Sequence, residues 1–122
     1  MPKAENFEAT FKRLKAVLKE YEKRMVLKSG GPENYYLNTP LTEKYQKELF
    51  FGAVQIKKNY VSYHLMPVYM FPELLKDVSP TLKKRMQGKS CFNFKTIDED
   101  VLRELAALTK KSFERLRKEK LL

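Results

Sequence analysis

Paired cysteines and long apolar runs are both missing from this sequence of 122 residues. The single cysteine, Cys91, has no partner for an internal disulfide, so nothing points to an oxidising compartment. No apolar run approaches the roughly 18 residues that a membrane helix needs, and the amino terminus lacks the apolar stretch of a signal peptide. We therefore expect a soluble, cytoplasmic protein without a membrane partner.

What the sequence does contain predicts one basic, globular domain over residues 1–122. A chain of this length can bury about two thirds of its unfolded surface, and its 43% hydrophobic and 33% charged residues are typical of a folded protein. Lysine and arginine outnumber aspartate and glutamate by 25 to 15, a formal charge of +10. Such a charge attracts polyanions at low salt, so weak polyanion binding is expected, but solvated lysine-rich helices have the same composition.

Apolar stripes with helical spacing predict a long helix at each end of the chain. The first helix is expected over residues 4–23. The last is expected to begin at Thr96, which matches a capping box with Glu99 in the first turn, and Asp98–Asp100 are favoured there by the helix dipole. The two stripes consist of Phe7, Phe11, Leu14, Leu18, Tyr21 and Met25, and of Val101, Leu102, Leu105, Leu108, Phe113 and Leu116.

Two hairpins and a fifth strand are predicted between these helices. Turn residues separate the β-compatible runs Met25–Lys28 and Tyr35–Asn38, and a proline-led polar loop follows over residues 40–49. The runs Phe50–Ile56 and Tyr60–Met66 flank a loop of three residues whose Asn59 tolerates the left-handed conformation. The fifth strand is the alternating segment KSCFNFK. The turn residues of the first hairpin are Gly30, Gly31, Pro32 and Asn34.

Pairing Ile56 with Tyr60 in the second hairpin predicts which residues share a face. In this register Gly52 lies opposite His64 and leaves room for the imidazole. The more apolar face, which is expected to pack under the helices, holds Phe51, Ala53, Val61, Tyr63 and Leu65. Tyr60, Ser62 and His64 are left on the open face.

Short helices are expected before the fifth strand. Pro72 and Pro80 stand where first helical residues belong, Ser79 is a good N-cap, and Gly88 indicates the C-terminal stop. The sum is an α+β fold: a largely antiparallel sheet of about five strands, with the N- and C-terminal helices on one face.

The run FFGAVQIKKNYVSYHLMPVY, followed by LKKRMQGKSCFNFK and a final helix, resembles the YdhG-like family of bacterial domains of unknown function. The resemblance covers roughly residues 24–118 and is most specific around KKN and at Gly88–Lys89. It implies a frataxin-like fold, with helices on one side of an antiparallel sheet, and an iron-carrying role that has been suggested for relatives. It implies no catalytic residues.

The first helix departs from the iron-carrying pattern, which is attributed to a ridge of carboxylates on the first helix and strand. The segment from Lys3 to Lys28 contains eight lysines and arginines, these two included, so a cation meets net repulsion there. The acidic residues among them are Glu5, Glu8, Glu20 and Glu22. We expect no cofactor, and one histidine with one cysteine falls short of a structural zinc site.

Polar residues of the second hairpin and of the fifth strand form the first candidate site, suited to a small ligand, a metal or a protein partner. The alternative is an ordinary solvated sheet face. A third hypothesis is a nucleophilic Cys91 paired with His64. Against it, a lone cysteine is usually a small buried hydrophobe. We expect a binding module and not an enzyme. The site residues are Tyr60, Ser62, His64, Cys91, Asn93 and Lys95.

A basic patch is the competing candidate. With Tyr35, Tyr36 or Tyr60 as stacking platforms it would suit single-stranded nucleic acid, although no RNP-type signature is present. The patch consists of Lys57, Lys58, Lys83, Lys84, Arg85 and Lys89.

The alternation of the fifth strand makes a stability prediction. Phe92→Ala should lower the free energy of unfolding by roughly 3–5 kcal/mol, as for a core aromatic, when measured by urea denaturation. A loss below about 1 kcal/mol would mean that the two faces of this strand are reversed.

Overall fold

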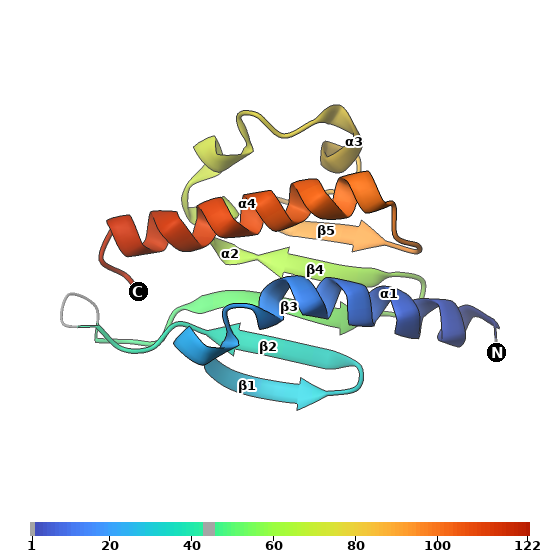
Figure 1. Cartoon of the computed structure of the whole chain (residues 1–122), viewed down its shortest axis with the longest axis horizontal. Helices are drawn as coiled ribbons and strands as arrows, with labels where there is room; N and C mark the ends of the chain where they lie inside the picture. Colours follow the sequence, from blue (N-terminus) through green and yellow to red (C-terminus); the bar gives the residue numbers. More distant parts are fainter. Residues whose placement is uncertain (1, 43–45) are drawn as a thin grey trace.

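The structure, a computed structural model that describes residues 2–42 and 46–122, contains one antiparallel sheet with the strand order β1-β2-β3-β4-β5 (Figure 1). The strands are β1 (Val26–Gly31), β2 (Asn34–Asn38), β3 (Phe50–Ile56), β4 (Val61–Leu65) and β5 (Cys91–Phe94). The helices are α1 (Pro2–Lys19), η1 (Glu22–Arg24), α2 (Met66–Met70), η2 (Pro72–Leu75), α3 (Pro80–Lys83) and α4 (Glu99–Lys118). The predicted α+β class is confirmed.

Helices α1 and α4 lie side by side over one face of the sheet (Figure 1). The hydroxyl of Thr109 on α4 donates to the carbonyl of Leu105 at 2.9 Å, so its oxygen accepts the proton of Tyr63 at 2.6 Å. This buried pair ties α4 to β4, and burial raises the pKa of the Tyr63 phenol. The helix stripes are buried in the core with Phe92, except for Tyr21 and Met25, which are partly buried against it. No described helix is long and apolar enough to cross a membrane.

The register of the second hairpin differs from the expected one by a single residue. Ile56 pairs with Val61 and Ala53 with His64, because the connection is four residues long, with the Lys57 amide donating to the Tyr60 carbonyl at 2.8 Å. A slip of one residue reverses the faces of a strand relative to its partner. Among the described residues, only Lys120 and Gly88 have positive φ, so the left-handed conformation expected for Asn59 is wrong.

A bulge in β3 accounts for a second error in the expected faces. Asn38 pairs with Phe50 and Leu37 with Gly52, so Phe51 is the extra residue. Its ring lies 6.0 Å from Tyr21 and 6.5 Å from Phe113, on the helix side of the sheet. Ala53, expected on that side, instead shares the opposite face with His64.

Helix α1 comes close to the backbone of the sheet at Gly52. A Cβ added there would lie 3.1 Å from Leu18 Cδ2 and 3.0 Å from the carbonyl oxygen of His64. The missing side chain therefore makes room for a core leucine, and not for the imidazole as the sequence suggested. Leu18 is fully buried at this contact.

The short helices follow the proline and serine signals only in part. Pro72 and Pro80 do begin η2 and α3, and the Ser79 hydroxyl accepts the Leu82 amide at 3.2 Å. Helix α2 is not among the expected elements, and its first residue, Met66, was expected to end the strand Tyr60–Met66. Gly88 does not end α3; it lies in the turn between residues 85–87 and β5. These two segments are hydrogen-bonded, with the backbone N–H of Asn93 donating to the Arg85 carbonyl at 2.7 Å.

Several element ends also differ from the expected ones. Helix α1 ends at Lys19, and Gly30 and Gly31 belong to β1. Asp98, not Thr96, caps α4, and its carboxylate accepts the amides of Asp100 and Val101 at 2.9 and 3.4 Å. Of the expected loop over residues 40–49, residues 43–45 lie outside the described part, and its flanks have no helix or strand before Phe50.

The close contact at Gly52 makes a stability prediction. Gly52→Ala should lower the free energy of unfolding by roughly 1–3 kcal/mol, because the added methyl group meets backbone as well as Leu18. Gly31→Ala is the control, since the nearest atom to its Cβ is 3.9 Å away. Urea denaturation of both variants measures the difference, and equal stabilities would contradict the tight approach of α1.

Candidate functional site

Two rows of side chains cross the open face of the sheet from β2 to β5. One row aligns Tyr36, Ala53, His64 and Cys91, and the other aligns Asn34, Gln55, Ser62 and Asn93. Strand alternation places both rows on the face opposite α1 and α4. The second row is polar throughout, and the Gln55 amide donates to Asn34 Oδ1 at 3.0 Å.

A shallow hollow of about 270 Å³ lies over these rows on β3, β4 and β5. Five of the six residues predicted for the open-face site line it; Lys95, which is exposed beyond the end of β5, does not. Asn93 Nδ2 donates to Gln87 Oε1 at 2.5 Å across one side of the hollow. The lining residues are Gln55, Lys57, Tyr60, Ser62, His64, Gln87, Cys91 and Asn93.

Gln55 and Gln87 are the lining residues that sequence reasoning missed. Gln55 pairs with Ser62, so strand alternation would have identified it had the hairpin register been right. No pattern in the sequence would have identified Gln87. It reaches the site because residues 85–87 run back along β5 before the turn at Gly88, with the Gln87 amide donating to the Cys91 carbonyl at 3.0 Å.

His64 is half-buried at one end of the hollow. Its Nε2 lies 2.7 Å from the hydroxyl of buried Ser90, and its ring makes an edge contact with Phe50, with centroids 4.7 Å apart. Burial lowers the pKa of the imidazole. The folded protein therefore presents a neutral histidine, held in place by Ser90, at neutral pH.

Cys91 and His64 are neighbours on adjacent strands. The Leu65 amide donates to the Ser90 carbonyl at 2.9 Å, so the adjoining pair His64–Cys91 is of the non-hydrogen-bonded type, in which side chains approach closely. Within the described part of the chain, no hydrogen bond joins the thiol to the imidazole, whose Nε2 is engaged by Ser90. The same residues include no group of three or more His, Cys, Asp or Glu side chains arranged to hold a metal.

The fold places the tyrosines that were expected as stacking platforms in different environments, one in the core and two on the open face. Tyr35 lies in the core, where its hydroxyl donates to Glu22 Oε1 at 2.5 Å, so its expected role as a platform is wrong. Tyr36 lies on the open face and stacks on Phe50 with ring centroids 4.5 Å apart. Tyr60 lines the hollow.

The predicted basic patch is not one cluster. Lys57 and Lys58 lie in the turn beside the Val61–Phe94 pair, whereas Lys89 lies beyond the Cys91–His64 pair at the other end of β4, 5.9 Å from the Tyr69 ring. The guanidinium of Arg85 lies 5.9 Å from the centroid of Phe94, on the helix side. Lys83 and Lys84 belong to α3 and its end. Because Phe94 pairs with Val61, Arg85 lies at the same end of β4 as Lys57 and Lys58, and Lys89 lies at the other end.

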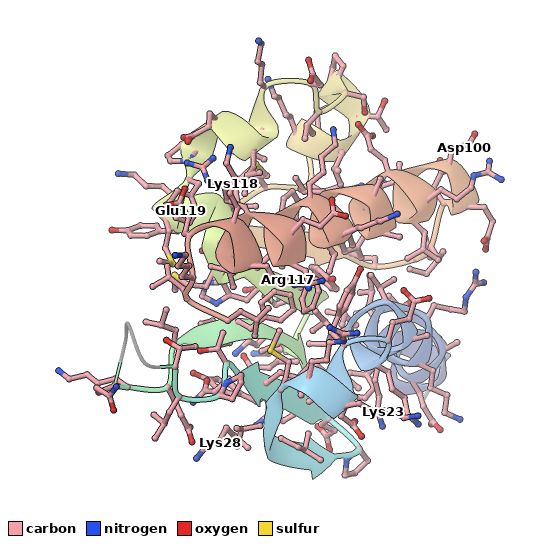
Figure 2. The ribbon with its side chains drawn as sticks, turned by 60° about the vertical axis from the view of Figure 1, so that its left-hand side comes forward. Lys23, Lys28, Asp100, Arg117, Lys118 and Glu119 are labelled. Carbon is pink, nitrogen blue, oxygen red and sulfur yellow. The ribbon has the colours of Figure 1, made fainter. Side chains whose placement is uncertain are left out.

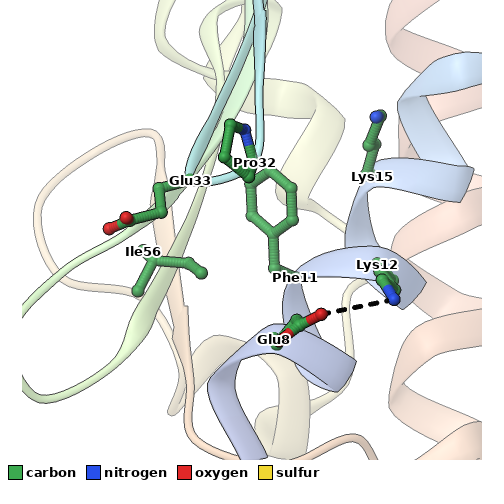
Figure 3. Close-up of a pocket in the computed structure, with 7 residues that line it drawn as sticks. All are labelled: Glu8, Phe11, Lys12, Lys15, Pro32, Glu33 and Ile56. Carbon is green, nitrogen blue, oxygen red and sulfur yellow. Dashed lines mark ion pairs between the residues drawn. The ribbon is translucent and has the colours of Figure 1, made fainter. Parts of the chain in front are cut away.

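A larger hollow, of about 410 Å³, lies between α1 and the β1–β2 turn (Figure 3). Its cations already have partners: Lys12 pairs with Glu8 at 3.4 Å, and Lys15 lies 5.1 Å from the centroid of the Tyr35 ring. Its floor is Phe11 and Ile56. We favour the open-face hollow as the functional site because more of its polar side chains converge on one space.

Comparison of this chain with protein-family models, curated proteins and solved structures finds no significant match.

The buried imidazole makes stability depend on pH. The unfolded chain, with a histidine pKa of about 6.5, binds a proton before the folded protein does as the pH falls, so the free energy of unfolding decreases below pH ~6.5. The free energy of unfolding stops decreasing once the pH is below the lowered pKa that His64 has in the folded protein. Urea denaturation between pH ~7.5 and ~5.5 should show this slope in the wild type and not in His64→Gln. Equal slopes in both proteins would contradict a depressed pKa.

Proposed function

We propose that this protein is a non-enzymatic binding module that takes a small polar ligand in the hollow on the open sheet face. The observation that carries the proposal is the lining itself: three amides, two hydroxyls, an imidazole, a thiol and one lysine converge on about 270 Å³. Ligand sites typically combine a concave surface with a few convergent polar groups.

The lining favours a ligand with both hydrogen-bond donors and acceptors. Amides offer an N–H donor and a carbonyl acceptor, and hydroxyls and a neutral imidazole also do both. Among the described residues no carboxylate lines the hollow, and Lys57 is the one charged side chain that does. Planar amides and heterocycles, which present donors and acceptors along one edge, are the class that this lining matches best.

The likeness to the YdhG-like family remains a prediction, and with it the iron-carrying role. Iron of the kind carried by frataxins prefers hard oxygen ligands such as carboxylates. The open-face hollow offers amide and hydroxyl oxygens instead. We therefore propose an organic ligand, and an iron titration belongs in the test below.

Single-stranded nucleic acid is a second candidate ligand, which the aromatic residues of the open face support. Tyr60 and Lys57 line the hollow, and Tyr36 lies in the row that contains His64. Stacked bases and a cation near the phosphates are the usual means of binding single strands. The net charge of +10 would assist association.

Amide NMR titrations test the choice of ligand. Uracil and nicotinamide as planar probes, iron(II), zinc, and a pool of short single-stranded RNA are each added at two salt concentrations. We expect the planar probes to shift the amides of Ser62, His64, Cys91 and Asn93 at both salts, because hydrogen bonds and not charge hold them. Asn93→Leu should weaken this binding roughly tenfold, the equivalent of one lost hydrogen bond.

Asn59→Leu is the matched control, because this exposed amide lies in the β3–β4 turn outside the lining. RNA shifts that spread over Tyr36 and Tyr60 and fade with salt would favour the second candidate. If iron or zinc shifted these amides and the planar probes did not, the proposal of an organic ligand would be wrong.

A further inference from the structure

A separate groove of about 380 Å³ lies on the helix side of the protein, between the end of α1 with η1 and the C-terminal half of α4. Its floor is aromatic: the rings of Tyr21 and Phe113 have centroids 4.8 Å apart. Charged side chains surround this floor. The residues of the groove are Glu20, Tyr21, Arg24, Lys110, Phe113, Glu114 and Arg117.

Two guanidinium groups converge on the Phe113 ring from different elements. Arg24 of η1 and Arg117 of α4 each lie 5.9 Å from its centroid. In Figure 2 Arg117 points from α4 toward the end of α1, whereas Lys118 points to the other side of α4. The cation–π contacts hold both guanidiniums at the groove without using their N–H donors.

Neither guanidinium has a carboxylate partner within the described part of the chain. Other arginines do: Arg13 pairs with Glu99 at 2.7 Å and Arg115 with Glu73 at 2.8 Å. Two like charges held near one ring repel each other, and an anion between them would remove that repulsion. Planar guanidiniums match the oxygens of a phosphate group in particular.

Two carboxylates also line the groove. Glu20 and Glu114 lie near the Tyr21 hydroxyl, and they add to burial, the larger cause, in raising its pKa. Carboxylates accept hydrogen bonds from hydroxyl groups, so Glu20 and Glu114 suit a polyol, and their charge disfavours an extended polyanion.

We propose that the groove binds a small sugar phosphate, with the phosphate between Arg24 and Arg117 and the sugar hydroxyls at Glu20 and Glu114. Lys110 supplies a third positive charge to the groove. This site is independent of the hollow on the open face, since it uses none of the same residues.

Calorimetric and NMR titrations with glucose 6-phosphate, inorganic phosphate and glucose test the proposal. We expect glucose 6-phosphate to bind more tightly than inorganic phosphate, and glucose alone not to bind. Arg24→Gln and Arg117→Gln should each weaken binding of glucose 6-phosphate at least tenfold. Lys23→Gln and Lys118→Gln remove the same charge from adjacent exposed positions and should change it less than threefold.

Glu114→Gln tests the hydroxyl end. It should reduce the preference for glucose 6-phosphate over inorganic phosphate, because a neutral amide accepts sugar hydroxyls less strongly, while leaving inorganic phosphate bound. Equal losses in all four charge-removing variants would show diffuse attraction only and would overturn the site. So would chemical shifts that spread away from the groove, or tighter binding of vesicles with phosphoinositide headgroups than of the free sugar phosphate.

Discussion

The rest of this structure depends on the contact between Leu18 of α1 and the bare backbone of Gly52 in β3. A side chain at position 52 would lie 3.1 Å from the leucine, so only glycine lets the helix come so close. The contact keeps α1 on one face of the sheet, where α4 joins it through the buried bond between Thr109 and Tyr63. Because both long helices cover the same face, the other remains free.

The bulge at Phe51 lies directly beside this contact in the sequence. The bulge directs the ring of Phe51 toward the helices, where it lies beside Tyr21 and Phe113. It also places Phe50 on the open face, against Tyr36 and His64. The same rearrangement thus supplies the core with one ring and the candidate site with another. Ser90 then fixes the imidazole, and residues 85–87 bring Gln87 to the edge of the hollow.

Two surfaces of different chemistry result, one on each side of the sheet. The open-face hollow is lined by amides and hydroxyls, whose hydrogen bonds select by shape and by donor and acceptor position. The groove between α1, η1 and α4 is charged, with two guanidiniums over one ring. We infer recognition of neutral polar groups on the first surface and of phosphate on the second.

The sequence by itself determined the α+β class, the two helix stripes and most strands, since apolar periodicity and turn residues act locally. It also placed Tyr60, Ser62, His64, Cys91 and Asn93 on the open face, because alternation along one strand needs no partner. Only the tertiary structure decided the hairpin register, the bulge at Phe51 and the role of Gly52, as each depends on what packs from elsewhere in the chain. The convergence of Arg24 and Arg117 on the Phe113 ring could not be predicted either, because it joins elements that are distant in sequence and meet only after folding.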